Sequence, residues 1–283
     1  MTHPIIPEYG DYDMGGRVRM DATIALANSD PMLLARGLIK GAGVVHKFGA
    51  STTVGTAFKP ITTSQTYQTP KVAEALEVVS DSTDDNGTTS PLGSGALKIR
   101  VYGITLWDAG EVTEEVVLDG TTPVSMATSF LRVYRVKVIE SGTYADATSV
   151  SHNSLITIRG VSVGVLWAQV TSQSGVGLGQ SEVALYAVGA GKVAYMPTAE
   201  AWIEAQKAAN LIFFVRDKAD VVVAPYSVRQ AKIIMRNVID AVHVEPKTPY
   251  GPFIGPCDLG WMGMATSQTA NIGVDFELIV YDV

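Results

Sequence analysis

The chain has 283 residues, a net charge of −7, a pI near 5.1 and only 17% charged residues. A nucleic-acid-binding face needs clustered Lys and Arg to displace counterions, so this acidic chain is not expected to contact nucleic acid directly. A charged fraction this small indicates that part of the surface faces other protein rather than water. No apolar run is long enough for a membrane helix, and the first residues lack the regions of a secretory signal. We therefore expect a soluble protein assembled in a cytoplasm, without a membrane partner.

Residues 1–45 are predicted to form an N-terminal arm, because Pro and Gly interrupt every strand pattern there. One short helix is expected from Ser29, which can cap the first turn, to Ile39, and Gly41 ends it. Its apolar face would consist of Met32, Leu33, Leu34, Leu38 and Ile39. The Thr-, Ser- and Pro-rich stretch 50–70 is interpreted as extended chain or loop, so residues 46–72 could be a looped extension of the domain that follows.

Two strictly alternating runs, 97–101 and 111–118, flank a turn at residues 108–110 (DAG). Alternation on both sides of a short Gly-containing turn predicts a β-hairpin. The inward-facing residues of this hairpin are predicted to be Leu97, Ile99, Val101, Val112, Val116 and Leu118.

The next strand changes its parity. Leu131 and Val133 are predicted to share one face, whereas further on the apolar residues are Val136 and Val138, which lie one residue out of step with that face. A parity change across Tyr134–Arg135 predicts a β-bulge, which strengthens twist and helps a sheet to curl.

Further strand candidates follow at short, regular spacing with turn residues between them, which is typical of an antiparallel sandwich. They are Ala75–Val79, Leu155–Gly160, Val163–Val170, Glu182–Val188, Lys192–Met196, Leu211–Arg216, Ala231–Ile234 and Phe276–Tyr281. The segment Thr198–Ala209 fits either a helix capped by Thr198 or a strand that includes Trp202 and Ile203. We predict a mainly β fold, with an antiparallel, jelly-roll-like β-sandwich domain over residues 46–283.

Two segments resemble ligand-binding loops only in composition. The glycine-rich segment 175–179 (GVGLG) leads into a strand-like run, so it is interpreted as an inter-strand loop and not as a phosphate-binding loop. Residues Asp81, Asp84, Asp85 and Asn86 lack the alternate spacing and terminal Glu of an EF-hand. They are interpreted as a solvated acidic turn, with Asn86 and Gly87 supplying positive φ angles.

Candidate catalytic and metal-binding groups are dispersed along the chain. His3, His46, His152 and His243 form no metal-binding spacing, and Glu114 and Glu115 must point to opposite faces of one strand. The only cysteine, Cys257, cannot form a disulfide within the chain and is interpreted as a small apolar filler. We therefore predict no catalytic residue, no metal and no cofactor, and hence a protein that is not an enzyme.

The four tryptophans are Trp107, Trp167, Trp202 and Trp261. Each is expected to pack in a core with its polar tip satisfied, rather than to form a carbohydrate platform. Trp261 lies in the apolar segment 260–264 (GWMGM), which favours a core or a subunit interface.

Several short sequence segments follow one another in a characteristic order along the chain. They are Val45–Gly49 (VHKFG), Leu97–Gly103 (LKIRVYG), Glu114–Pro123 (EEVVLDGTTP), Phe130–Val136 (FLRVYRV), Val188–Tyr195 (VGAGKVAY) and Val274–Val280 (VDFELIV). Over residues 45–283 the chain thereby resembles a family of virion structural proteins from tailed bacteriophages with podovirus-like genomes. This resemblance implies a non-enzymatic particle component with a jelly-roll-like sandwich, found in the virion after assembly in the host cytoplasm.

Three functions remain open at this point. The first is a capsid-associated protein, either a decoration or a minor capsid protein, that contacts copies of itself and the major capsid protein as a homo-oligomer. The second is a tail, connector or baseplate component built on the same type of sandwich. The third is a receptor- or glycan-binding module that uses surface aromatic residues.

Overall fold

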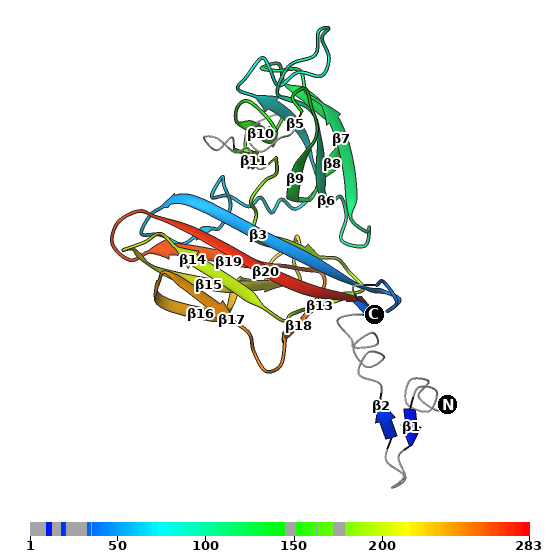
Figure 1. Ribbon diagram of the computed structural model, residues 1–283, viewed down its shortest axis with the longest axis vertical. Helices are drawn as coiled ribbons and strands as arrows, with labels where there is room; N and C mark the ends of the chain where they lie inside the picture. Colours follow the sequence, from blue (N-terminus) through cyan, green and yellow to red (C-terminus); the bar gives the residue numbers. More distant parts are fainter. Residues whose placement is uncertain are drawn as a thin grey trace.

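The computed structural model describes residues 10–12, 18–20, 33–34, 36–144, 151–161, 164–171 and 179–283. Nearly all the regular structure in these ranges is antiparallel β-sheet, as Figure 1 shows. The prediction of a mainly β, sandwich-like fold is therefore confirmed. Among the described residues, no helix combines the length and the apolar character that crossing a membrane requires.

The strands from both ends of the chain form one sandwich, here called the base sandwich. Its first sheet contains β3 (Ala42–Val54), β13 (Lys192–Met196), β14 (Ala199–Ile203), β17 (Ala241–Val244), β18 (Tyr250–Ile254) and β20 (Ala270–Asp282). Its second sheet contains β4 (Lys59–Pro60), β12 (Leu185–Val188), β15 (Ala208–Asp217), β16 (Gln230–Ile239) and β19 (Cys257–Ala265). The long strand β20 organises the first sheet, because β3 pairs along one edge of it and β14 and β13 share the other.

The middle of the chain forms a second sandwich, here called the inserted sandwich, which lies above the base sandwich in Figure 1. One sheet has the order β11–β10–β5–β8 and the other the order β7–β6–β9. The strands are β5 (Glu74–Ser80), β6 (Ala96–Ile104), β7 (Val112–Val117), β8 (Val124–Phe130), β9 (Arg132–Ser141), β10 (Ile156–Gly160) and β11 (Leu166–Val170).

Within residues 46–283, which the sequence pattern assigned to one sandwich, the hydrophobic core is divided in two. One core joins both sheets of the base sandwich around Phe213, Trp261 and Phe276, whose rings are in contact. The other core joins both sheets of the inserted sandwich and includes Ile99, Val136 and Ile156. Each sandwich therefore buries its own apolar faces.

The predicted hairpin is confirmed as β6 and β7. The register places Ile99 opposite Val116 and Arg100 opposite Glu115. Five of the six residues predicted to face inward are buried, and Val112, next to the turn of the hairpin, is half-buried. Alternation was sufficient here because one face of the hairpin meets a core and the other meets solvent.

The predicted bulge is also confirmed. Tyr102 pairs with Arg135 and Gly103 pairs with Val133, which leaves Tyr134 as the extra residue of β9. The predicted shared face of Leu131 and Val133 is wrong, because β9 begins at Arg132 and Leu131 packs into the core of the base sandwich. The bulge likewise turns Tyr134 into the base core while Val133 stays in the inserted one, so one strand serves both cores.

The remaining strand candidates correspond to β5, β10, β11, β12, β13, β15, β16 and β20, several of them longer than predicted. The helix alternative for Thr198–Ala209 is wrong. Residues Ala199–Ile203 form β14, in which burial alternates strictly, and Ala208 begins β15. The strand alternative, with Ile203 buried and Trp202 exposed, is therefore the correct one.

Most of the predicted arm lies outside the described residues. Two short strands, β1 (Gly10–Tyr12) and β2 (Val18–Met20), pair with each other. Of the predicted helix, only Leu33 and Leu34 have helical geometry among the described residues, and turns follow as far as Gly41. β3 then begins at Ala42, which pairs with Tyr281.

Candidate functional site

In the acidic turn of residues 81–86, Asp81 and Asp84 are exposed as predicted, but the prediction is wrong for Asp85, which is fully buried. Its carboxylate accepts hydrogen bonds from the Ser80 hydroxyl and from the backbone N–H groups of Ala96, Asn153 and Ser154. Asn86 and Gly87 do not adopt positive φ angles either. The Asn86 side chain instead accepts the N–H groups of Thr88 and Thr89. The carboxylate of Asp85 therefore fixes three loops of the inserted sandwich.

The described histidines occupy three separate elements. His46 is exposed on β3 and bonds Asp275 at 2.7 Å, and His243 is exposed on β17 with Glu245 at 3.7 Å. His152 is buried before β10, and its Nδ1 lies 2.8 Å from the Ser151 hydroxyl. Among the described residues, no group of three or more His, Cys, Asp or Glu side chains could hold a metal ion. His3 and the segment 172–178, which includes most of the glycine-rich loop, lie outside the described residues.

Glu114 and Glu115 point to opposite faces, as predicted. Glu115 pairs with Arg100 across the hairpin, and Glu114 accepts the backbone N–H groups of Ala127 and Thr128. These hydrogen bonds connect β7 of one sheet to β8 of the other. Neither carboxylate is left to share a proton or a substrate with the other.

Two of the tryptophans lie in the hydrophobic cores, Trp261 in the base sandwich and Trp167 in the inserted one. Trp107 is half-buried and packs against the base core, and Trp202 is about half exposed on β14. Cys257 is buried in the base core, where burial and the neighbouring Asp258 raise the pKa of its thiol. Its interpretation as a small apolar filler agrees with this position.

The two sandwiches are joined by a buried ion pair. The Arg132 Nε donates to Asp258 Oδ1 at 2.7 Å and its Nη2 donates to Oδ2 at 2.9 Å, and both side chains are 1% exposed. The Tyr67 hydroxyl donates to the same Oδ1, and the Trp107 ring lies 5.0 Å from the guanidinium carbon. Burial opposes the charge of Arg132, but the bonds and charge of Asp258 outweigh this effect and raise the pKa of Arg132.

A second buried cation lies at the same junction. Lys47 faces inward on β3, and its Nζ donates to the carbonyl oxygen of Tyr134 on the bulge of β9. Burial, with the charge of Arg135, holds the pKa of Lys47 well below its usual value. Beside it, the Tyr134 hydroxyl donates to Glu111 at 2.8 Å. These bonds fix the inserted sandwich on the edge strand of the base sandwich.

A small hollow of ≈ 290 Å³ opens at this junction. Its lining residues are Val44, Val45, His46, Lys47, Tyr102, Glu111, Tyr134 and Arg135. The Arg135 guanidinium donates to the His46 carbonyl oxygen across it, so the polar groups of the hollow are largely used in joining the two sandwiches.

An apolar groove of ≈ 900 Å³ lies on the outer face of the first base sheet. Cross-strand register contributes to it, because Ile279 and Tyr195 lie side by side on β20 and β13. The adjacent row consists of Tyr281, Val193 and Ile254 on β20, β13 and β18. Ile254 is 61% exposed, although large apolar side chains on the outer face of a sheet are usually covered.

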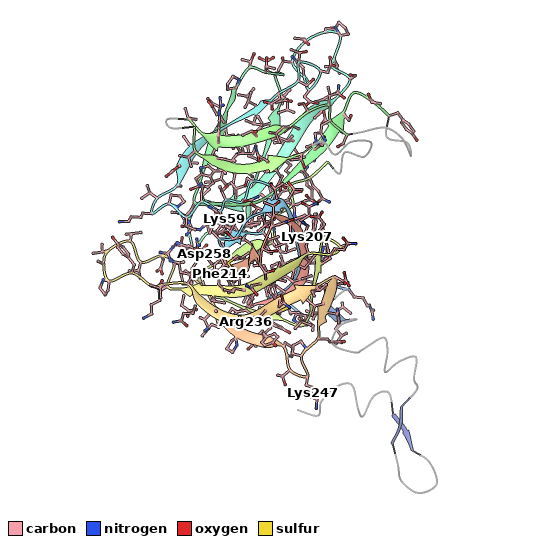
Figure 2. The ribbon with its side chains drawn as sticks, turned by 90° about the vertical axis from the view of Figure 1, so that its left-hand side faces the viewer. Lys59, Lys207, Phe214, Arg236, Lys247 and Asp258 are labelled. Carbon is pink, nitrogen blue, oxygen red and sulfur yellow. The ribbon has the colours of Figure 1, made fainter. Side chains whose placement is uncertain are left out.

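A second exposed apolar element connects β15 to β16 and projects from the side of the base sandwich (Figure 2, yellow). Residues 221–228 have the sequence VVVAPYSV, and this segment is here called the apolar loop. Val223 is 72% and Val228 69% exposed, and Val222 and Tyr226 are also exposed. The sequence pattern was not interpreted as a contact surface here. An apolar run that is interrupted by Pro225 and lies outside any strand is nevertheless a detectable signal of an exposed apolar segment.

No family model matches the chain, and neither does any curated protein. Among solved structures, infectious bursal virus derived T=1 particles align with 9% identity over 86% of this chain and 74% of that chain, with a TM-score of 0.20. The infectious bursal disease virus VP2 subviral particle aligns with 9% identity over 86% and 77%, with a TM-score of 0.17. TM-scores this low do not correspond to a shared fold, so the function of the chain has to be inferred from its own residues and geometry.

Proposed function

We propose that the chain is a non-enzymatic structural component of a tailed-bacteriophage particle. Within that class we propose a capsid-associated protein, a decoration or minor capsid protein, that acts through contacts between its own copies and with the shell. The observation that carries this proposal is the apolar groove on the outer face of a regular, well-packed sheet. Exposed apolar surface of this kind is typical of protein–protein contact sites.

The chemistry of the polar groups supports a structural role. The buried charged groups Asp85, Arg132 and Asp258 are hydrogen-bonded within the fold. An active site needs such groups to converge on a space that a substrate can enter. The apolar groove, which offers that space, has no carboxylate, imidazole, thiol or amine among its lining residues.

The connection between the sandwiches supports a particle component as well. A bidentate buried ion pair and the Lys47 contact fix the inserted sandwich on the base sandwich at two points. A unit of this kind can hold a fixed orientation on a lattice, which a repeating shell requires. The sequence resemblance to tailed-phage virion proteins points in the same direction.

Quantitative mass spectrometry of purified particles tests the proposal. A capsid-associated protein should be present in hundreds of copies per particle and should appear on the head in averaged particle images. A low copy number, as in a small ring, together with density at the tail, would instead identify the chain as a tail or connector component. Absence from washed particles, or selective binding to a glycan array, would contradict the structural role.

A further inference from the structure

We infer that strand β1, in the N-terminal arm of one copy, adds to the free edge of strand β16 in a second copy of this chain. This inference rests on the proposed structural function and names a surface by which the copies contact one another. β16 is the last strand of the second base sheet and pairs with β15 alone. The edge of such a strand presents unpaired backbone N–H and C=O groups, which an extended segment of another chain can complete.

Among the described strands, β16 has the long edge that the fold leaves open. Three edge strands have ten or more residues, namely β3, β9 and β16. The segment before β12 contacts the edges of the first two. The Val183 N–H donates to the Phe48 carbonyl oxygen on β3. The Val138 N–H on β9 donates to the Gly179 carbonyl oxygen. Within the described part of the chain, no backbone bond of this kind reaches β16.

The edge of β16 is basic. Its pairing with β15 has one bulge at Lys232 and another at Arg236 and Asn237, where β16 has one residue more than β15. Both cations are exposed, and neither forms an ion pair with a described residue, although Asp217 lines the same hollow as Lys232. Cations at both ends of the run Ile233–Met235 oppose pairing of β16 with a second β16 and favour an acidic partner strand.

The arm provides an acidic strand whose own edge is open. The segment 8–13 (EYGDYD), which contains β1, has the acids Glu8, Asp11 and Asp13 and no Lys or Arg. Arg19 belongs to β2, so it lies on the strand beyond β1 and not at the open edge. β1 and β2 form a sheet of two strands, and such a sheet is marginally stable in water until a third strand joins it.

The charges of the two edges match in an antiparallel register, which is the sense of every pairing between the named strands. With Asp13 opposite Lys232, Glu8 comes opposite Asn237 and next to Arg236. Opposite charges on neighbouring strands stabilise their pairing and fix its register.

A second copy supplies the partner that each edge lacks. Within one chain β1 pairs only with β2, and Figure 1 shows this pair apart from both sandwiches. A contact between two different surfaces of the same chain is heterologous, so it repeats from copy to copy and closes into a ring or continues as an open array. Each copy then gives its arm to one neighbour and receives the arm of another.

Photo-crosslinking between two isotopic forms of the protein tests the contact. A full-length chain with p-benzoylphenylalanine in place of Ile234, which is 54% exposed, is mixed with an excess of heavy-isotope-labelled full-length chain and irradiated. Mass spectrometry should find the β16 peptide joined to a heavy peptide that contains residues 8–13. The same probe in place of Leu92, 58% exposed on a loop of the inserted sandwich, should not reach the arm.

Three outcomes of this experiment overturn the inference. A crosslink to a light arm peptide alone would show that the arm folds onto its own chain. A crosslink to any other segment would identify a different occupant of the edge. A complete lack of crosslinks at Ile234 would show that the edge of β16 stays open.

Charge exchange gives a second readout, which separates loss of the contact from loss of the fold. An edge variant, Lys232→Glu with Arg236→Glu, should weaken self-association in sedimentation velocity by about tenfold, because repulsion replaces two exposed ion pairs. An arm variant, Glu8→Lys with Asp13→Lys, should weaken it to the same extent. An equal mixture of the two variants should associate again, since each arm then finds an edge of opposite charge on the other variant.

The control variant, Lys59→Glu with Lys247→Glu, makes the same change of net charge at two exposed lysines outside β16 and should leave association unchanged. If the mixture associates no better than either variant alone, the inference is wrong. Particles that contain the chain in hundreds of copies without the crosslink between β16 and the arm overturn the inference alone. The crosslink in a protein absent from particles overturns the proposed function alone.

Discussion

Arg132 and Asp258 form a two-point ion pair although 126 residues separate them in the chain. Arg132 opens β9 of the inserted sandwich, and Asp258 lies on the outward side of β19 in the base sandwich, near Phe214 and below the inserted sandwich (Figure 2). Both side chains are removed from water, and the Asp258 carboxylate is balanced mainly by Arg132, with Arg216 Nη1 3.7 Å from its Oδ2. The relative placement of the two sandwiches therefore depends on both partners.

Removing one partner of the Arg132–Asp258 ion pair should destabilise the fold. Arg132→Met is expected to lower the free energy of unfolding by about 3 kcal/mol, because it leaves the buried Asp258 carboxylate without its two-point partner and with only Arg216, at 3.7 Å, as a cation nearby. Urea denaturation measures this change, and the inserted sandwich should begin to unfold separately from the base sandwich. The double variant Arg132→Met with Asp258→Leu should recover part of the loss, since no unpaired charge remains. A loss of less than about 1 kcal/mol, as expected for an exposed pair such as Arg100–Glu115, would contradict the structural role of the buried pair.

The register of the β6–β7 hairpin predicts unequal effects at adjacent positions. Val101 is fully buried and Arg100 is partly exposed, so Val101→Asp should cost several kcal/mol, whereas Arg100→Asp should destabilise the fold much less. Thermal and chemical unfolding of the two variants provide the comparison. Equal losses would show that the two side chains do not face core and solvent as the structure places them.

Buried His152 should make stability depend on pH in the acidic range. Burial lowers the pKa of His152, although Asp85 and a backbone hydrogen bond at Thr171 act against this shift. Between the lowered folded-state pKa and the ordinary value of 6.5, the unfolded chain binds a proton that the folded chain does not. Stability should therefore be complete above pH 6.5 and fall as the pH decreases, by at most about 1.4 kcal/mol per pH unit.

Replacing His152 by Asn removes the titrating group from this position. The variant should show a flatter dependence of unfolding free energy on pH below 6.5 than the native chain, when both are measured by denaturant titration. Parallel curves for the two proteins would assign the acid sensitivity to other groups.

Deleting residues 1–28 should leave the fold intact. No residue before Val54 belongs to either main hydrophobic core among the described residues, so little core burial is lost. The unfolding midpoint of the truncated chain should match that of the full chain, while its incorporation into particles should fail. We expect this because a Pro- and Gly-broken arm buries little on its own and gains more by packing on a neighbouring subunit. Unfolding of the truncated chain would show instead that the arm is part of the fold.

Local patterns in the sequence predicted the local structure. The alternation of residues 97–101 gave the hairpin faces, and the parity change at Tyr134 located the bulge. These features depend on neighbours a few residues apart. The assignment of Thr198–Ala209 was ambiguous for the opposite reason, because β14 is short and its partners β17 and β20 lie far along the chain.

The features that carry the proposed function depend on distant residues and left no local signal. The residues around Asp85 have the composition of a solvated turn. Asp85 itself is buried because residues 153 and 154, far along the chain, approach it. The apolar groove combines residues of three strands, β13, β18 and β20, none of which is unusual alone. Lys47 is the exception, since a lysine at an inward position of β3 could have indicated a buried polar junction.

The two connections to the inserted sandwich run side by side. Thr62 bridges Val183, and the Thr63 N–H donates to the Glu182 carbonyl oxygen at 3.1 Å. The chain thus leaves the base sandwich and returns to it within the width of one antiparallel pair, about 5 Å. Residues 64–181 therefore form one continuous segment, and exchanging it would interrupt no strand pairing of the base sandwich. If the chain is a particle component, as proposed, exchange of this segment would change what the particle displays at this place and leave every residue that lines the apolar groove unchanged.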